Sequence, residues 1–127
     1  ITLISLNEEY REKIEPGAAT YANRLAALRA LHDAGCKTWV SIEPYPTPNL
    51  IGQSLTEILK AVSFTDRIIF GRTNYNETVS AYRENKRFYN ECAEEVIAFC
   101  EKQGIGCHIK EKTQTERAKE RDCNGVG

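Results

Sequence analysis

The 127-residue chain contains no methionine, one tryptophan and no apolar run of about 18 residues. The missing apolar run excludes a transmembrane helix, and no signal-peptide pattern opens the chain. The missing initiator methionine predicts a fragment or a processed product. Lys and Arg number 17 against 18 Asp and Glu, a net charge of −1. Bulk charge therefore gives no reason to expect binding to nucleic acid or to a membrane.

The cysteines lack the close spacing of a metal site or a disulfide framework. Their number is odd, which fits a reducing, cytoplasmic compartment. Two of them each follow a helix-ending glycine and are expected to be small core residues, and two others lie eight residues apart on one helix, a poor chelating spacing. The sequence therefore predicts no zinc or iron–sulfur site from Cys36, Cys92, Cys100, Cys107 and Cys123.

The sequence does contain four short segments rich in β-branched residues, and each of them ends in polar or charged residues. They are Ile1–Leu6, Lys37–Ile42, Arg67–Phe70 and Cys107–Ile109. Helical patterns separate them, and this alternation is typical of a parallel β/α sheet or barrel, where chemistry gathers at the carboxyl ends of the strands.

Local signals set the expected helix limits. Thr20 is the predicted N-cap of a first helix that ends at Ala34, with Leu25, Leu28 and Leu31 as its buried stripe. Ser54 is expected to cap a second, shorter helix. The third and longest helix should begin at Val79 or Tyr82 and stop before Gly104. Trp39, in mid-strand, is expected in the core.

Three helices over four strands (β-α-β-α-β-α-β) predict an α/β fold, a partial parallel (β/α) barrel of about half the size of a TIM-like barrel. Residues 1–112 would form this unit, and 113–127 a polar, mobile tail. Backbone groups along Ile1–Leu6 would be left unpaired at the sheet edge. We therefore expect missing chain, or a partner subunit of a homo-oligomer, to cover that edge.

Several blocks of sequence resemble the second half of radical S-adenosylmethionine proteins of the spore photoproduct lyase type, often labelled DNA repair photolyases. The resemblance covers roughly residues 1–112. It is carried by the order and spacing of Glu15-Pro16-Gly17-Ala18-Ala19, Arg24-Leu25, Leu28-Arg29-Ala30-Leu31-His32-Asp33-Ala34-Gly35, Thr38-Trp39-Val40-Ser41-Ile42-Glu43-Pro44 and Phe70-Gly71-Arg72-Thr73-Asn74.

The resemblance implies a partial six-stranded barrel, of which Ile1–Leu6, Lys37–Ile42 and Arg67–Asn74 would be the fourth to sixth strands. It also implies a 4Fe-4S cluster that cleaves S-adenosylmethionine to a radical. In this family a Cys-x-x-x-Cys-x-x-Cys loop holds the cluster, and no such loop occurs in these 127 residues. We therefore expect both cofactors in the parent protein and none on this chain alone, which would be inactive by itself. Nucleic acid is suggested as a partner by the family label alone.

For two residues the resemblance implies a role in cofactor binding, and each also has an ordinary structural interpretation. Ser5, at the end of the first segment, would lie against the cofactor's ribose, or its hydroxyl would bind nearby backbone. Arg24 would grip the methionyl carboxylate with its guanidinium fork, or it would be solvated or paired with a neighbouring acid.

Two further candidates lie at later strand ends. The carboxylate of Glu43 could bond to a ribose hydroxyl or an amino group, or form a salt bridge with Arg72. Asn74 occupies the matching position one strand further on. The predicted binding set is thus Ser5, Arg24, Glu43 and Asn74, with no metal ligand and no assigned catalytic residue.

The sequence leaves two other functions open. The chain could be a stand-alone half-barrel that self-associates and binds a small ligand without iron. It could instead be another barrel enzyme that uses Lys110, although no glycine-rich phosphate loop precedes a helix. Nothing in the sequence identifies a substrate.

Overall fold

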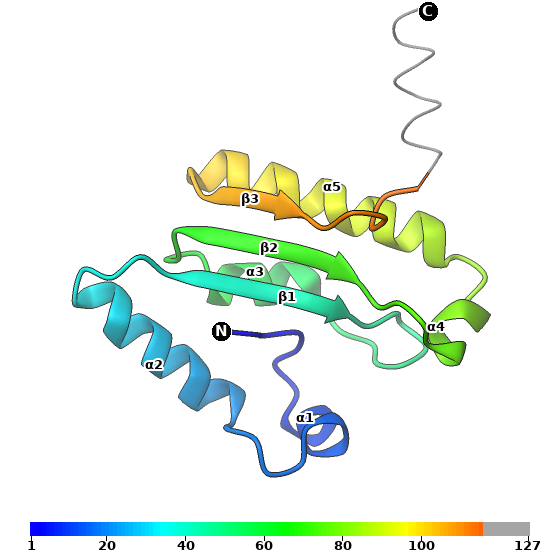
Figure 1. The fold of residues 1–127 in the computed structure, drawn as a ribbon, viewed down its shortest axis with the longest axis horizontal. Coiled ribbons are helices and arrows are strands. Elements are labelled where there is room, and N and C mark those ends of the chain that lie inside the picture. Colours follow the sequence, from blue (N-terminus) through cyan, green and yellow to red (C-terminus); the bar gives the residue numbers. More distant parts are fainter. Residues whose placement is uncertain (116–127) are drawn as a thin grey trace, which may run out of the picture.

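The computed structural model describes residues 1–115 and has a mixed α/β fold around a three-stranded parallel sheet. The strands are β1 (Trp39–Tyr45), β2 (Arg67–Arg72) and β3 (Gly106–Ile109), with β2 in the centre. The helices are α1 (Glu8–Ile14), α2 (Tyr21–Asp33), α3 (Leu55–Ala61), α4 (Glu77–Ala81) and α5 (Asn85–Gln103). Figure 1 shows the strands side by side in a sheet that is not closed, with α5 along β3. The α/β class is confirmed.

The core lies on one face of the sheet. Side chains alternate along a strand, and four that share a face are fully buried: Val40 and Ile42 from β1, Ile68 and Phe70 from β2. They belong to one hydrophobic cluster with Leu28 of α2, Ile58 and Leu59 of α3, and Val96 and Cys100 of α5. The helices thus cover the face to which these residues point.

The first predicted strand is largely absent. Instead of a strand over Ile1–Leu6, the structure has a single parallel bridge between Thr2 and Ser41. Leu3 N–H donates to Ser41 O at 2.9 Å, and Ser41 N–H donates to Ile1 O at 2.7 Å. Pairing stops there because the chain turns at Ser5 into α1, a helix that the sequence pattern did not predict.

Helix ends follow the sequence signals closely. The Thr20 hydroxyl accepts from Asn23 N–H, the Ser54 hydroxyl accepts from Glu57 N–H, and Gly104 ends α5 with a positive φ of 71°. The expected third helix is interrupted, however. Tyr82 has an extended backbone between α4 and α5, and Asn85 N–H donates to Tyr82 O.

Several predictions of burial are wrong. Trp39 is 55% exposed and Leu31 51% exposed, so neither belongs to the core. Cys36 precedes β1 and is exposed, and Cys107 is exposed on the edge strand β3. Cys92 and Cys100 are the buried cysteines, both on α5.

The start of the expected tail is packed against α5. Thr113 is fully buried, and Asn90 of α5 exchanges two hydrogen bonds with Thr115, at 2.9 and 3.2 Å. The rest of the tail, residues 116–127, lies outside the described residues. Within residues 1–115, no helix combines the length and apolar character needed to cross a membrane.

Candidate functional site

The face of the sheet opposite the core is the candidate site, because polar side chains gather on it. The strand register places Thr2, Ser41, Ile69 and His108 in one row across the sheet, and Trp39, Arg67 and Gly106 in the next. We call this surface the open face. Its side chains range from half-buried (Ser41, Glu43, Ile69) to exposed (Trp39, His108), whereas Val40, Ile42, Ile68 and Phe70 on the opposite face are fully buried.

Glu43 lies on the open face toward the carboxyl ends of the strands. Its carboxylate occupies the space beside Gly71 of β2, where the side chain of any other residue would collide with it. A side chain at position 71 would therefore displace the Glu43 carboxylate, whereas glycine leaves it in place. The pair holds one carboxylate at a defined place on the sheet, half-exposed and able to accept hydrogen bonds from a ligand.

Arg67 brings a positive charge to the amino ends of the same strands. Its guanidinium carbon lies 5.2 Å from the centre of the Trp39 ring, a cation–π contact, and its Nε is buried with no hydrogen-bond partner among the described residues. The open face therefore carries a cation beside an exposed aromatic ring at one end and a carboxylate at the other.

The Arg72 side chain is held by an aromatic contact. It stacks over the Tyr89 ring at 4.8 Å, and its Nη2 donates to Asn85 Oδ1 at 3.4 Å. Tyr89 in turn donates to Tyr45 O at 2.7 Å, and burial raises the pKa of its phenol. Among the described residues Arg72 forms no ion pair with Glu43, so that carboxylate is not neutralised by the arginine considered from the sequence.

Ser5 is fully buried, and its hydroxyl accepts from Asn7 N–H at 3.0 Å. This is the backbone-binding alternative considered for that residue, and it fixes the turn into α1. Asn74 is exposed in the connection between β2 and α4, next to Tyr75, which has a positive φ of 56°.

Arg24 of α2 is occupied by the protein itself. Its Nε donates to Ala19 O, its Nη1 to Thr2 O, and its Nη2 binds Glu15 at 3.0 Å. Both ends of the guanidinium fork are thus in use, so binding a ligand carboxylate there would displace Thr2 or Glu15. None of Arg24, Ser5, Glu43 and Asn74 lines the pocket between the Leu6–Asn7 segment and the start of α3.

A second arginine, Arg11, was not among the sequence candidates. Only 4% of it is exposed, and it binds Glu8, Glu12 and the carbonyl of Ala18. Glu8 also accepts from Tyr21 N–H at 3.0 Å, which joins α1 to the start of α2. Burial acts to raise the pKa of Glu8, but the Tyr21 N–H and Arg11 together hold it below its ordinary value. The spacing of Glu8 and Arg11, three residues apart, was the available signal.

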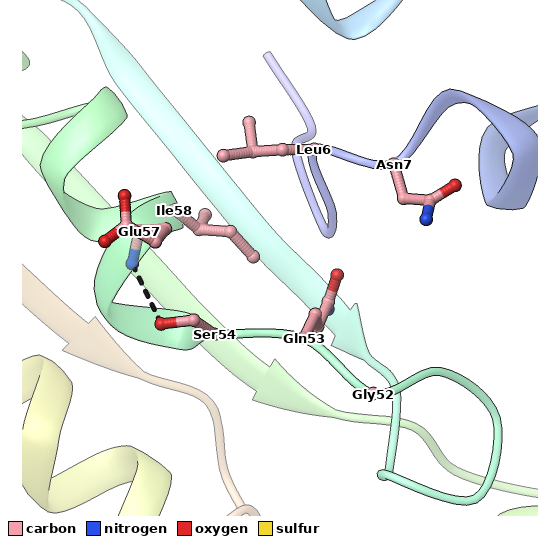
Figure 2. A pocket seen from close by; sticks show the side chains of 7 residues that line it. All are labelled: Leu6, Asn7, Gly52, Gln53, Ser54, Glu57 and Ile58. Atoms are coloured by element: carbon pink, nitrogen blue, oxygen red, sulfur yellow. Dashed lines mark hydrogen bonds between the residues drawn. The ribbon is translucent and has the colours of Figure 1, made fainter.

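A cavity of about 270 Å³ opens between the Leu6–Asn7 segment and the start of α3. Figure 2 shows Gln53 pointing from the loop before α3 toward this segment. Gln53 Nε2 donates to Ile4 O at 2.9 Å, so the side chain ties the N-terminal segment to that loop. The cavity lies at the carboxyl-end side of the sheet, where ligands bind in parallel α/β folds.

No group of three or more His, Cys, Asp or Glu side chains within residues 1–115 is arranged to hold a metal ion. In particular, the cysteines described do not fit a 4Fe-4S cluster, which needs several thiolates converging on one point. Comparison with known proteins adds nothing to this chemistry: no family model, no curated protein and no solved structure matches the chain.

Proposed function

We propose that this chain forms part of the barrel of a radical S-adenosylmethionine enzyme, resembling the spore photoproduct lyase type, in a reducing cytoplasm. In this proposal the open face is the inner wall of an incomplete (β/α) barrel. The observation that carries the proposal is the contrast between the two faces of one parallel sheet. Helices bury one face, while the other presents Ser41, Glu43, Arg67 and His108. Parallel sheets are normally covered on both faces, so a further wall is expected opposite the open face.

The two implied cofactors fit this chain differently. The cluster does not fit, and another part of the protein would have to supply its cysteine loop. S-Adenosylmethionine has hydroxyl and amino donors that suit a half-exposed carboxylate such as Glu43. Ser5 and Arg24 are committed to internal hydrogen bonds, so the proposal assigns ligand binding on this chain to the open face.

The test is binding of S-adenosylmethionine to the complete protein, purified without oxygen and measured by calorimetry. Glu43→Gln should weaken binding about tenfold, the effect of losing one charge-assisted hydrogen bond of about 1.4 kcal/mol. Gly71→Ala should weaken it similarly, because the added methyl group displaces the Glu43 carboxylate.

Glu91→Gln is the matched control. Glu91 is exposed on α5, where it pairs with Arg87, and its substitution should leave binding unchanged. Equal affinities for all four proteins would remove Glu43 from the site. The absence of any binding in the unaltered protein would contradict the proposal itself.

The alternative function is a half-barrel that self-associates and binds a small ligand without iron. The exposed Trp39 and the half-buried Ile69 favour packing of a second copy of the chain on the open face. Light scattering that shows a discrete dimer, together with an absence of iron in the complete protein, would support this alternative over the enzyme.

A further inference from the structure

Two of the cysteines, Cys100 and Cys107, meet across the boundary between α5 and β3. Cys107 pairs with Ile68 in the strand register, which puts it in the row of Val40 and Ile68, on the face covered by helices. Cys100 is 1% exposed and belongs to the core cluster on that face, and α5 packs against both β2 and β3.

The turn between α5 and β3 brings the two cysteines close together. Gly104 has a positive φ, and Ile105 N–H donates back to Cys100 O at 2.9 Å, so the chain reverses within a few residues of Cys100. The strand that follows then brings Cys107 alongside the last turn of α5. The two thiols are close enough that each affects the pKa of the other.

The two thiols differ in access and in acidity. Burial raises the pKa of Cys100 to about 12, so Cys100 stays protonated. Burial also raises the pKa of Cys107, and the neighbouring Cys100 thiol and the positive charge of Arg67 offset only part of this rise. Cys107 is exposed as a residue and can be reached from solvent, whereas Cys100 is covered. An exposed thiol beside a buried one is an arrangement in which oxidation of the first leads to a disulfide with the second.

We propose that Cys107 and Cys100 form a peroxide-sensitive thiol pair that closes to a disulfide and fastens α5 to the edge strand β3. The Cys107 thiolate attacks one oxygen of hydrogen peroxide and releases hydroxide, which takes up a proton to become water. The Cys107 sulfur becomes a sulfenic acid, a two-electron oxidation matched by reduction of the peroxide. The Cys100 sulfur then attacks the Cys107 sulfur, the S–O bond breaks, and a second water leaves with the Cys100 proton. Two thiols and one peroxide thus give one disulfide and two waters.

The test uses hydrogen peroxide and a variant that keeps these two cysteines alone: Cys36→Ser, Cys92→Ser and Cys123→Ser combined. Trypsin cuts after Lys102, so Cys100 and Cys107 fall on separate peptides, 88–102 and 103–110. Mass spectrometry without reductant should find these peptides joined, with the loss of two hydrogen atoms. Joining should proceed about tenfold faster in the folded protein than in concentrated urea, because folding holds the sulfurs together. A further Cys100→Ser substitution is the control and should leave Cys107 as an unlinked oxidised thiol.

The unaltered protein provides a second measurement in case the triple variant does not fold. Fragment ions of the joined peptides distinguish Cys100 from Cys92, which share peptide 88–102. The oxidised protein should also melt about 5 °C higher than the reduced one, since the crosslink restricts the unfolded chain. A link through Cys92 or Cys123, no link at all, or equal rates in folded and urea-treated protein would overturn the proposal.

Discussion

Replacing Ile68 by alanine should lower the free energy of unfolding by about 3 kcal/mol, whereas the same substitution at Ile69 should cost about 1 kcal/mol. The two residues are neighbours in β2 and lose the same atoms, so strand propensity and side-chain size are matched. They differ in the face to which they point. Ile68 is fully buried in the helix-covered core, and Ile69 lies half-buried on the open face. Urea denaturation of the two variants measures the difference directly.

Comparing Ile68→Ala with Ile69→Ala also tests whether anything covers the open face. Equal losses in this chain would mean that both faces are buried, which would contradict the two-faced sheet. If further strands close a barrel over Ile69 in the complete protein, the cost of Ile69→Ala should rise there toward that of Ile68→Ala. A cost that stays near 1 kcal/mol in the complete protein would argue against a covering wall at this position.

Arg11→Met should lower the melting temperature by roughly 5 to 10 °C. The substitution keeps the length of the side chain but removes the bonds to Glu8, Glu12 and Ala18 O, and leaves the carbonyl without its donor. Arg83→Met is the matched control, because Arg83 is exposed, and it should change the melting temperature by about 1 °C or less. Thermal unfolding followed by circular dichroism provides the measurement.

The bonds that Glu8 forms with Arg11 and Tyr21 should be sensitive to acid. The folded pKa of Glu8 lies below its ordinary value, so the stability that Glu8 contributes is fully present above that value and is lost as the pH falls through the folded pKa. The difference in melting temperature between the unaltered protein and Glu8→Gln should therefore shrink below about pH 4. A difference that grew in acid would show that the carboxylate is not stabilised by Arg11 and Tyr21 as described.

Local features of the fold were predictable from sequence, and long-range ones were not. Thr20, Ser54 and Gly104 mark helix ends because caps depend on residues three or four positions away. Trp39 was misplaced because alternation along a strand shows that two faces exist but not which of them meets the helices. The break at Tyr82 was missed because the helical pattern of apolar residues continues across it.

The candidate site shows the same division. Glu43 was selected because it follows an apolar run, a local sign, and the structure places it within β1. Its fit against Gly71 depends on the register of two strands separated by a whole helix, which no spacing in the sequence reveals. Arg24 was singled out as a ligand-binding residue, yet its internal bonds to Thr2 and Glu15 exist only once α2 packs beside the N-terminal segment. Cys100 and Cys107 become neighbours through the turn at Gly104, although each was considered separately.

The most direct test of the proposed function is the iron and sulfide content of the complete protein, encoded with whatever precedes Ile1 and purified without oxygen. The proposal predicts about four iron and four sulfide per chain, with a three-cysteine loop in the preceding sequence. It also predicts that this chain by itself carries neither. A complete protein that contains no iron and no such loop would contradict the assignment of the open face to a radical S-adenosylmethionine barrel.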